Sequence, residues 1–547
     1  MEFVRPYPEE LFRKNRKIWP GITLIDAFDR TCDITSEKVA VVDGEKRISF
    51  AQLRKMVHAA ALVFLEMGID TGAQVLYQVP NCLEAVVVYL ALDMINAVPV
   101  LCLPRHGQRE LERFATLTEA STWIGAAAWG KISYMPMVEA VRERIPSLQN
   151  IVVVGPETPA GGIHLAAMTE KMKPVSRSTD RLLERRPSPD DVLHLAPTGG
   201  TTGVPKLVPK THNVQLSRAT YWARTAERGP GDIYLVIGPI SHDATQITSM
   251  AFLALYGGTL VFCPSLDPEA ILGHLENEKI TYSFLVPTIL SDIAHTKGLE
   301  NYRFSPDLKI GTGGAWAPPE LVRTICHRIP CTFFNTYGMT EGAGFMTRST
   351  DPLEVVAGTV GRQQCPYDEF RIVDDEGNAL PIGQEGELVG RGPCLVSGYY
   401  KSEEEDARAF TADGFFRTGD VGRIDRAGNL TITGRKKDLI KRGAETIIPF
   451  EIEEMISEHP AVQQTAVVGM PDDRLGERIC AYVQPLPGRT ITFEGLIAFL
   501  KEKGASPLLL PERLETMDAF PLTAMQKISK QALREDVAQK LASEKSK

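Results

Sequence analysis

Residues 192–206 read VLHLAPTGGTTGVPK: a short apolar run, Val192 to Ala196, leads into a loop of glycines and hydroxyls that ends at Lys206. The apolar run predicts a buried strand. The glycines let the backbone take positive φ and approach a ligand closely. Successive N–H groups and hydroxyls then form an anion cradle, to which Lys206 adds positive charge. The spacing differs from the GxxxxGK[ST] of a P-loop, and a flexible surface loop is the alternative. We predict a nucleotide-phosphate loop that uses Thr198, Gly199, Gly200, Thr201, Thr202, Gly203 and Lys206.

Short β-branched runs alternate with longer amphipathic segments on both sides of this loop. A chain of 547 residues is too long for one compact core. The alternation favours α/β layers with largely parallel sheets. The expected strands include 74–79, 151–154, 234–237 and 259–262, and the expected helices include 50–67 and 82–95.

The texture changes twice toward the C-terminus. Residues 363–433 are short, turn-rich segments, such as Asp425-Arg426-Ala427-Gly428-Asn429, which predict a small antiparallel β-subdomain. A new α+β unit follows, with a helix near 449–458 and strands near 465–468 and 479–483. We therefore predict an N-terminal domain over 1–437 and a small C-terminal lid domain over 438–547.

Composition excludes several classes of protein. Hydrophobic residues make up 43% and charged residues 24%, as in an ordinary soluble protein. A net charge of -9 and the lack of a long basic run argue against nucleic acid as a partner. The most apolar stretch, 83–103, is interrupted by Glu84, Asp93 and Asn96, which argues against a membrane span. The N-terminus lacks an apolar signal, and the nine dispersed cysteines, with no CxxC pair, predict neither a zinc site nor a disulfide framework. We expect a cytoplasmic protein.

Five motifs in order resemble those of the adenylate-forming superfamily, which includes acyl- and aryl-CoA synthetases, amino-acid adenylation domains and luciferases. They are the 198–206 loop, Asn335-Thr336-Tyr337-Gly338-Met339-Thr340-Glu341, Thr418-Gly419-Asp420, Gly434-Arg435-Lys436-Lys437-Asp438 with Lys441-Arg442-Gly443, and Pro521-Leu522-Thr523-Ala524-Met525-Gln526-Lys527. Within the superfamily, the segments 6–10, 98–104, 391–393 and 398–400 are similar to stand-alone aryl-acid ligases of the 2,3-dihydroxybenzoate–AMP ligase type.

The resemblance implies an ATP- and Mg²⁺-dependent activation of a carboxylic acid to its acyl-AMP. The loop at Thr198 would hold the β- and γ-phosphates, Thr340 would donate to the α-phosphate, and Glu341 would bind Mg²⁺, a cation that prefers oxygen ligands. Lys527 would bridge the acyl carboxylate and the phosphate, and so stabilise charge that converges in the transition state.

The resemblance also assigns the base and the ribose. Tyr337 would stack on adenine, within the element that also holds Asn335 and Gly338. The backbone of Gly313-Gly314-Ala315 would line the other side of the base pocket. Asp420 would accept from the ribose hydroxyls, with Arg435 nearby. Each residue alone is more often structural, and only their joint occurrence favours a site.

The position before the lysine departs from the family. It is Gln526, where relatives carry glycine. If that position needs positive φ, Gln526 strains the loop by about 1–2 kcal/mol and shifts Lys527.

The family rotates its C-terminal domain between its two half-reactions. The pivot would fall at Asp438, and in the second state the Gly443 loop would face the site while Lys527 swings away. The alternative for Asp438 is a helix N-cap.

The acid pocket draws on residues 238–244, with His242, Asp243, Gly313 and Met339 as candidates and His242 also as a candidate catalytic group. Relatives for hydroxybenzoates carry His-Asn-Tyr where this chain has His242-Asp243-Ala244. A buried carboxylate needs a partner. Asp243 therefore either pairs with an amine on the substrate or pairs with a cation of the protein itself, and Ala244 predicts a roomier pocket.

The second half-reaction needs a thiol. No carrier segment follows Lys527, so the acceptor would be coenzyme A or a separate phosphopantetheinyl carrier protein. The leading hypothesis is an aryl-acid–thiol ligase, as a monomer or homodimer. A CoA ligase for an alicyclic or medium-chain acid, and a non-catalytic nucleotide-binding relative, are the alternatives.

Overall fold

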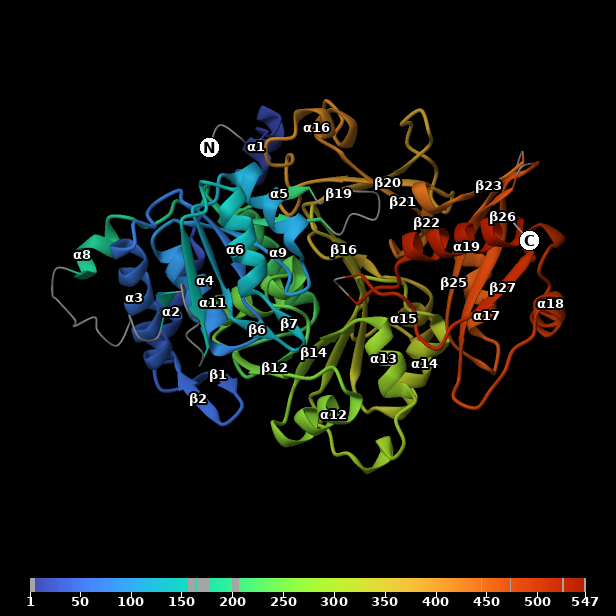
Figure 1. Cartoon of the computed structure of the whole chain (residues 1–547), viewed down its shortest axis with the longest axis horizontal. Helices are drawn as coiled ribbons and strands as arrows, with labels where there is room; N and C mark the ends of the chain where they lie inside the picture. Colours follow the sequence, from blue (N-terminus) through green and yellow to red (C-terminus); the bar gives the residue numbers. More distant parts are fainter. Residues whose placement is uncertain are drawn as a thin grey trace.

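The computed structural model describes residues 5–155, 163–165, 178–198, 206–443, 445–472, 474–523 and 526–545. Its N-terminal part is built on two large sheets, whose inner strands are parallel (Figure 1). In spatial order the first sheet comprises β18 (Arg362–Gln363), β17 (Gly342–Met346), β16 (Thr332–Met339), β15 (Lys309–Thr312), β14 (Tyr282–Leu285), β12 (Ile233–Val236), β13 (Thr259–Phe262), β1 (Val39–Asp43) and β2 (Lys46–Ser49). The second comprises β11 (Leu207–Thr211), β10 (Val192–Pro197), β4 (Val98–Leu101), β3 (Gln74–Gln78), β5 (Thr122–Ala126), β8 (Asn150–Val154) and β9 (Ile163–His164).

A layer of helices is buried between the two sheets. Every residue of helix α4 (Leu83–Met94) except Glu84 is buried. A helix that is buried on all sides has apolar residues all round, which accounts for the apolar stretch in the sequence. Helix α3 (Phe50–Glu66) begins at a Ser49 capping box that Gln52 completes. Both helices share one core with α2 (Leu24–Ile34), α9 (His212–Thr225) and α11 (Phe252–Tyr256).

Further helices cover the outer faces. Helices α12 (Pro268–Asn277), α13 (Pro287–Ala294), α14 (Pro319–Arg328) and α15 (Leu353–Gly358) pack on the first sheet, and α5 (Gln108–Thr118) and α6 (Met135–Arg144) pack on the second. The predicted α/β class with parallel sheets is confirmed. The predicted strand 259–262 coincides with β13, and the predicted helices agree with α3 and α4 to within one residue at each end.

Two smaller units complete the chain. An antiparallel sheet comprises β19 (Glu369–Val373), β20 (Gly386–Arg391), β21 (Phe416–Ile424) and β22 (Leu430–Arg435), where the sequence predicts a β-rich subdomain. The C-terminal unit comprises β23 (Ile440–Arg442), β24 (Glu445–Ile447), β25 (Val462–Asp472), β26 (Gly476–Pro485) and β27 (Arg513–Thr516) with α17 (Pro449–Ser457), α18 (Phe493–Glu502) and α19 (Lys530–Lys545).

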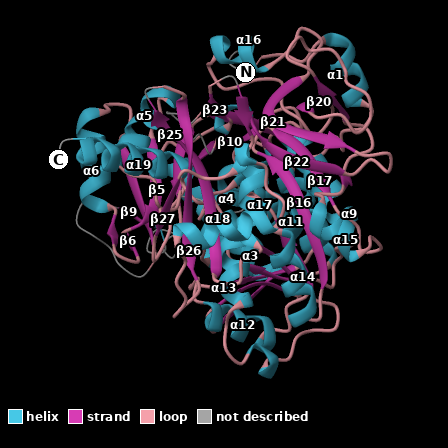
Figure 2. Cartoon of the chain, turned by 90° about the vertical axis from the view of Figure 1, so that its right-hand side faces the viewer, coloured by secondary structure: helices cyan, strands magenta, loops and turns pink. Residues whose placement is uncertain are grey.

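The C-terminal unit lies at one end of the molecule beside the antiparallel sheet, and Figure 2 looks onto that end. The turn η3 (Lys436–Asp438) connects the two. Strands β25 and β26 of the C-terminal unit are longer than the sequence predicts. Their antiparallel register of ten residue pairs extends the hydrogen bonding beyond the apolar centre of each strand. Over the described residues, no helix is long and apolar enough to cross a membrane.

Candidate active site

A cavity of about 2110 Å³ opens where three parts of the protein meet: the N-terminal part with its two large sheets (the large unit), the antiparallel sheet and the C-terminal unit. It brings together every predicted site residue within the described ranges except Gly443. The predicted residues that line it are Thr198, Lys206, His242, Asp243, Gly313, Gly314, Ala315, Asn335, Tyr337, Gly338, Met339, Thr340, Glu341, Asp420, Arg435, Asp438 and Lys527.

The predicted phosphate loop leaves β10 and returns into β11, which pair antiparallel. Its base is closed by two hydrogen bonds: Thr198 N–H donates to the Lys206 carbonyl at 2.8 Å, and Lys206 N–H donates to Thr198 Oγ1 at 3.2 Å. The Lys206 ammonium lies 2.6 Å from Glu405 Oε2 and over the Tyr399 ring. The predicted residues Gly199, Gly200, Thr201, Thr202 and Gly203 lie outside the described residues.

Three of the predicted nucleotide-binding residues lie together in the cavity. Asp420 on β21 is the register partner of Arg435 on β22, whose Nε lies 2.6 Å from Asp420 Oδ1. The Tyr337 hydroxyl donates to Asp420 Oδ2 at 2.7 Å. Burial, together with the adjacent Asp420, raises the pKa of Tyr337 well above its usual value, so the phenol stays a donor.

The glycines opposite leave a cradle that a side chain would fill. A Cβ on Gly313 would lie 2.3 Å from Thr336 Oγ1, and Gly314 has φ +81°. A Cβ on Gly314 would lie 3.4 Å from Lys527 Cε, so the lysine stem passes directly over this backbone. The space kept open is next to both Tyr337 and Lys527. Asn335 shapes its rim, since its amide donates to the carbonyls of residues 356 and 359.

The turn between β16 and β17 carries Thr340 and Glu341 into the cavity. The Tyr399 hydroxyl donates to Glu341 Oε1 at 2.7 Å. The Lys210 ammonium donates to the Thr340 carbonyl. Burial and the neighbouring Arg218 cation lower the pKa of Lys210 to about 7. A carboxylate beside a hydroxyl is a donor set suited to a hard divalent cation such as Mg²⁺.

Asp243 lies among basic side chains of the protein. Arg218 Nη1 donates to Asp243 Oδ2 at 2.6 Å, Lys210 Nζ lies 3.9 Å from the same oxygen, and His194 Nε2 lies 3.6 Å from Oδ1. Burial alone would raise the pKa of Asp243, but Arg218 and Lys210 hold it well below its usual range. Of the two alternatives for this carboxylate, pairing with a protein cation describes the geometry.

His242 is the N-cap of a short helix, α10 (Asp243–Thr245), and its Nδ1 accepts from Ala244 N–H at 3.3 Å. Burial, with Lys527 nearby, lowers the pKa of His242 to about 4, so the imidazole is neutral near pH 7. A π-helical segment (Gln246–Ala251) follows, a conformation that is frequent at functional sites.

Lys527 reaches the cavity from the C-terminal unit. Burial, and then Arg435, lower the pKa of its ammonium to about 8. In the described part of the chain, no carboxylate forms an ion pair with it. Its neighbour Gln526 has φ +60°, which is the strained conformation that the sequence predicts if this position requires positive φ. The Gln526 carbonyl accepts from Thr288 Oγ1 at 3.1 Å, across the boundary between units.

The predicted hinge and thiol-side loop lie at the edge of the site. Asp438 Oδ1 accepts from Arg534 Nη2 of α19 at 2.8 Å, so the carboxylate is an ion-pair partner of that helix and not an N-cap. Gly443 has φ +63°, and its N–H donates to the Leu475 carbonyl at 2.7 Å, away from the cavity.

Sequence reasoning missed several residues that organise the cavity. Lys210 follows the phosphate loop on β11, and that proximity was the one available signal. Arg218 on α9, and Arg105 and Thr288, which contact Gln526, have no motif of their own. Trp316 packs edge-on against Phe450 of α17, with ring centroids 5.3 Å apart, across the same boundary.

Three features together indicate an enzyme of the adenylate-forming class. They are the loop that closes on a lysine, the Tyr–Asp–Arg cluster opposite a glycine cradle, and the lysine that the small C-terminal unit carries into the cavity. Models of two protein families match the chain: "AMP-binding enzyme" over residues 28–400 and "AMP-binding enzyme C-terminal domain" over residues 451–527. The chain belongs to the AMP-binding enzyme family, and it is an adenylate-forming acid–thiol ligase.

Relatives of the chain match over nearly its whole length. The 2,3-dihydroxybenzoate-AMP ligase of Bacillus subtilis (strain 168) is 33% identical over 542 residues, which are 98% of this chain and 98% of that protein. The salicyl-AMP ligase / salicyl-S-ArCP synthetase of Mycobacterium tuberculosis is 34% identical over 537 residues, 96% of this chain and 93% of that protein. The apo structure of MbtA from Mycobacterium smegmatis has a TM-score of 0.74 at 32% identity, covering 98% of this chain and 99% of that one.

Proposed function

We propose that the enzyme activates an aromatic carboxylic acid with ATP and Mg²⁺, releases pyrophosphate, and passes the acyl group to a phosphopantetheine thiol. The observation that carries this proposal is the position of Lys527: a half-buried ammonium without a carboxylate partner in the described chain, held over the Gly314 backbone beside Tyr337 and Asp420. Partial desolvation of an unpaired cation is unfavourable, and an anionic ligand at that point would offset the cost.

The residues around Lys527 fit a nucleotide. Asp420 would accept from the ribose hydroxyls, and Arg435 would hold its carboxylate in place. Tyr337 and the Gly313–Ala315 backbone would enclose the base. Thr198 and Lys206 mark the end of the cavity where the phosphates would lie.

Adenylation needs positioning and charge stabilisation more than covalent chemistry by the protein. The substrate carboxylate attacks the α-phosphorus, the acyl–O–P bond forms, and the bond to pyrophosphate breaks. Lys527 would pair with the carboxylate and an α-phosphate oxygen, and Thr340 would donate to that phosphate. Glu341 would hold Mg²⁺, which when bound neutralises phosphate charge. Neutral His242 would line the acyl side without adding charge.

An aromatic acid fits the walls of the acyl end of the cavity. Trp222 and Phe284 contribute faces there, with ring centroids 5.5 Å apart, and Ala244 leaves room beside them. The relatives named for dihydroxybenzoate and salicylate support this class of substrate. Because Arg218 already pairs with Asp243, an amine on the acid is not required.

The thioester step would follow a rearrangement of the C-terminal domain, residues 438–547, against residues 1–437. Asp438 would be the pivot, and the Gly443 loop would replace Lys527 at the cavity. The acceptor would be a separate carrier protein or coenzyme A.

ATP–pyrophosphate exchange against benzoates, hydroxybenzoates, aminobenzoates and alicyclic acids tests the proposal. We expect exchange with an aromatic acid, a loss of about 100-fold or more in Lys527→Ala, and no loss in the surface control Lys503→Ala. Exchange supported by alicyclic acids alone would contradict the substrate class. Product formation with coenzyme A, compared with a phosphopantetheinylated carrier, identifies the thiol.

A further inference from the structure

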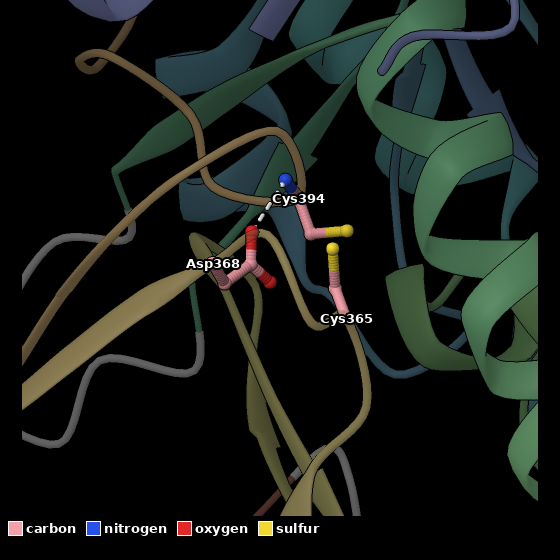
Figure 3. A group of neighbouring side chains, drawn as sticks. All are labelled: Cys365, Asp368 and Cys394. Carbon is pink, nitrogen blue, oxygen red and sulfur yellow. Dashed lines mark hydrogen bonds between the residues drawn. The ribbon is translucent and has the colours of Figure 1, made fainter. Parts of the chain in front are cut away.

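Three potential metal ligands form a compact group outside the catalytic machinery described above. Cys365, Asp368 and Cys394 each offer one ligand atom, and these atoms all lie within 4.8 Å of one another (Figure 3). All three residues are buried: Cys365 is 1%, Asp368 4% and Cys394 5% exposed. Two thiols and a carboxylate at this spacing make a donor set typical of a zinc-type cation.

The fold, and not the chain spacing, assembles the group. Cys365 and Asp368 lie just before β19, and Cys394 lies just after β20. The register pair Glu369–Arg391 brings those two strand ends together. Cys394 N–H donates to Asp368 Oδ1 at 3.1 Å, which orients the carboxylate from behind (Figure 3). A backbone donor to a ligating carboxylate is the kind of support that metal ligands commonly have.

The group lacks positive charge. Within the described ranges, no lysine, arginine or histidine forms an ion pair with Asp368. The nearby Arg218 is already paired with Asp243. Burying a carboxylate without a cation is costly, and a bound divalent cation would remove that cost.

We propose that Cys365, Asp368 and Cys394 form a binding site for one thiophilic divalent cation, with Zn²⁺ as the representative. Binding forms two metal–thiolate bonds and one metal–carboxylate bond, and the two thiol protons pass to solvent. All three residues line the central cavity, which gives the ion an entry path and leaves its fourth coordination position for water.

The site lies directly behind the turn that carries Glu341. Val396 N–H donates to the Glu341 carbonyl at 2.9 Å. A Cβ on Gly342 would lie 2.7 Å from the Cys394 carbonyl oxygen and 2.6 Å from Leu395 Cα, so the two segments are in close contact. A cation that fixes Cys394 to Cys365 therefore braces the 394–396 segment against the Glu341 turn. Its role is structural, and the proposal does not depend on the identity of the acid.

Cobalt titration of the full-length, reduced protein tests the site. We expect thiolate-to-cobalt charge-transfer absorption that saturates at about one equivalent, is lost in Cys365→Ser and Cys394→Ser, and is displaced by Zn²⁺. Cys331→Ser, which alters a thiol outside the group, is the matched control and keeps the absorption. A wild-type protein without this absorption, or absorption that survives both serine substitutions, overturns the proposal.

A measurement on the unaltered protein covers the case in which a variant fails to fold. Alkylation of each cysteine is followed by peptide mapping with and without Zn²⁺. At free zinc about 100 times Kd, site occupancy should slow alkylation of Cys365 and Cys394 about 100-fold, with Cys331 unchanged. Equal rates with and without zinc, or a zinc-resistant disulfide between Cys365 and Cys394 in the freshly purified protein, contradict the proposal.

Discussion

Arg218 and Asp243 form a 2.6 Å ion pair in the wall of the cavity, where Asp243 is 3% exposed and the Arg218 side chain 10%. Lys210, fully buried, adds a second cation at 3.9 Å. The pair joins α9 to the start of α10 and sets the charge of the pocket wall before any substrate binds. The same carboxylate that suggests an amine-bearing substrate in the sequence is thus an internal counter-ion.

Replacing Asp243 with asparagine should destabilise the protein without changing its preference for amines. The change leaves Arg218 and Lys210 buried without their counter-charge, and removing one partner of a buried ion pair costs about 3–5 kcal/mol. Urea denaturation followed by tryptophan fluorescence should show that loss, whereas Glu354→Gln, in an exposed pair with Arg323, should leave the curve unchanged.

The same Asp243→Asn protein tests whether Asp243 pairs with an amine on the substrate. The ratio of kcat/KM in pyrophosphate exchange, between an aminobenzoate and its desamino analogue, should match that of the wild type. A selective loss for the amine would show that Asp243 reads the substrate after all.

Gln526, which stands where the motif has glycine, makes a side-chain contact with Arg105 that glycine could not make. When its side-chain amide is oriented with the oxygen toward Arg105, that oxygen accepts from Arg105 Nη1 at 2.8 Å and Nη2 at 2.9 Å, which joins the lysine loop to the N-terminal part. We expect Arg105→Ala and Gln526→Ala each to slow adenylation about fivefold, because Arg105 is exposed and a solvent-exposed hydrogen bond contributes about 1 kcal/mol. Arg109→Ala, an exposed neighbour, is the control.

The double substitution distinguishes this contact from two separate effects. If the two side chains act only through each other, Arg105→Ala with Gln526→Ala should slow exchange no more than either change alone. Fully additive losses would contradict the contact. Gln526→Gly should in addition relieve backbone strain of about 1–2 kcal/mol and raise the melting temperature of the C-terminal unit.

The lowered pKa of Lys527 predicts that kcat/KM for adenylation falls at basic pH. Its pKa in the free enzyme is lowered to about 8 by burial and by Arg435, and the charged form is the one that binds anions. Adenylation kcat/KM should therefore be full below pH 8 and fall as pH rises through about 8. Lys527→Arg, whose guanidinium stays charged, should lose this fall even if its rate is lower. A fall that persists in that variant would assign it to another group.

The site residues that could be predicted from the sequence are those in motifs with a recognisable composition and a recognisable order along the chain. Tyr337, Asp420 and Lys527 belong to motifs, and the structure brings them into one cavity. Strand lengths in β25 and β26 were underestimated, because hydrogen-bond register extends a strand past its apolar core.

Residues that act through partners remote in sequence could not be predicted. Arg218 and Arg105 are defined by the carboxylate and the amide they meet in the fold. Cys365 and Cys394 have no CxxC spacing, and only the pairing of β19 with β20 brings them together. The expectation of no zinc site followed from spacing alone, and spacing does not detect ligands that a sheet register assembles.

Asp420 offers the sharpest separation of nucleotide binding from acid binding. Asp420→Asn keeps the shape but removes the charge that holds Arg435 Nε at 2.6 Å and accepts from Tyr337. Losing a charge-assisted hydrogen bond costs about 1.5–3 kcal/mol. We therefore expect KM for ATP to rise at least about tenfold in pyrophosphate exchange, because 1.4 kcal/mol is a factor of ten in an equilibrium constant. KM for the acid should change little, since the acyl wall of Trp222 and Phe284 is untouched. Asp374→Asn, at an exposed turn of the same antiparallel sheet, is the matched control and should leave both constants unchanged. Equal rises in both KM values would mean that Asp420 supports the cavity as a whole, and that the ribose is held elsewhere.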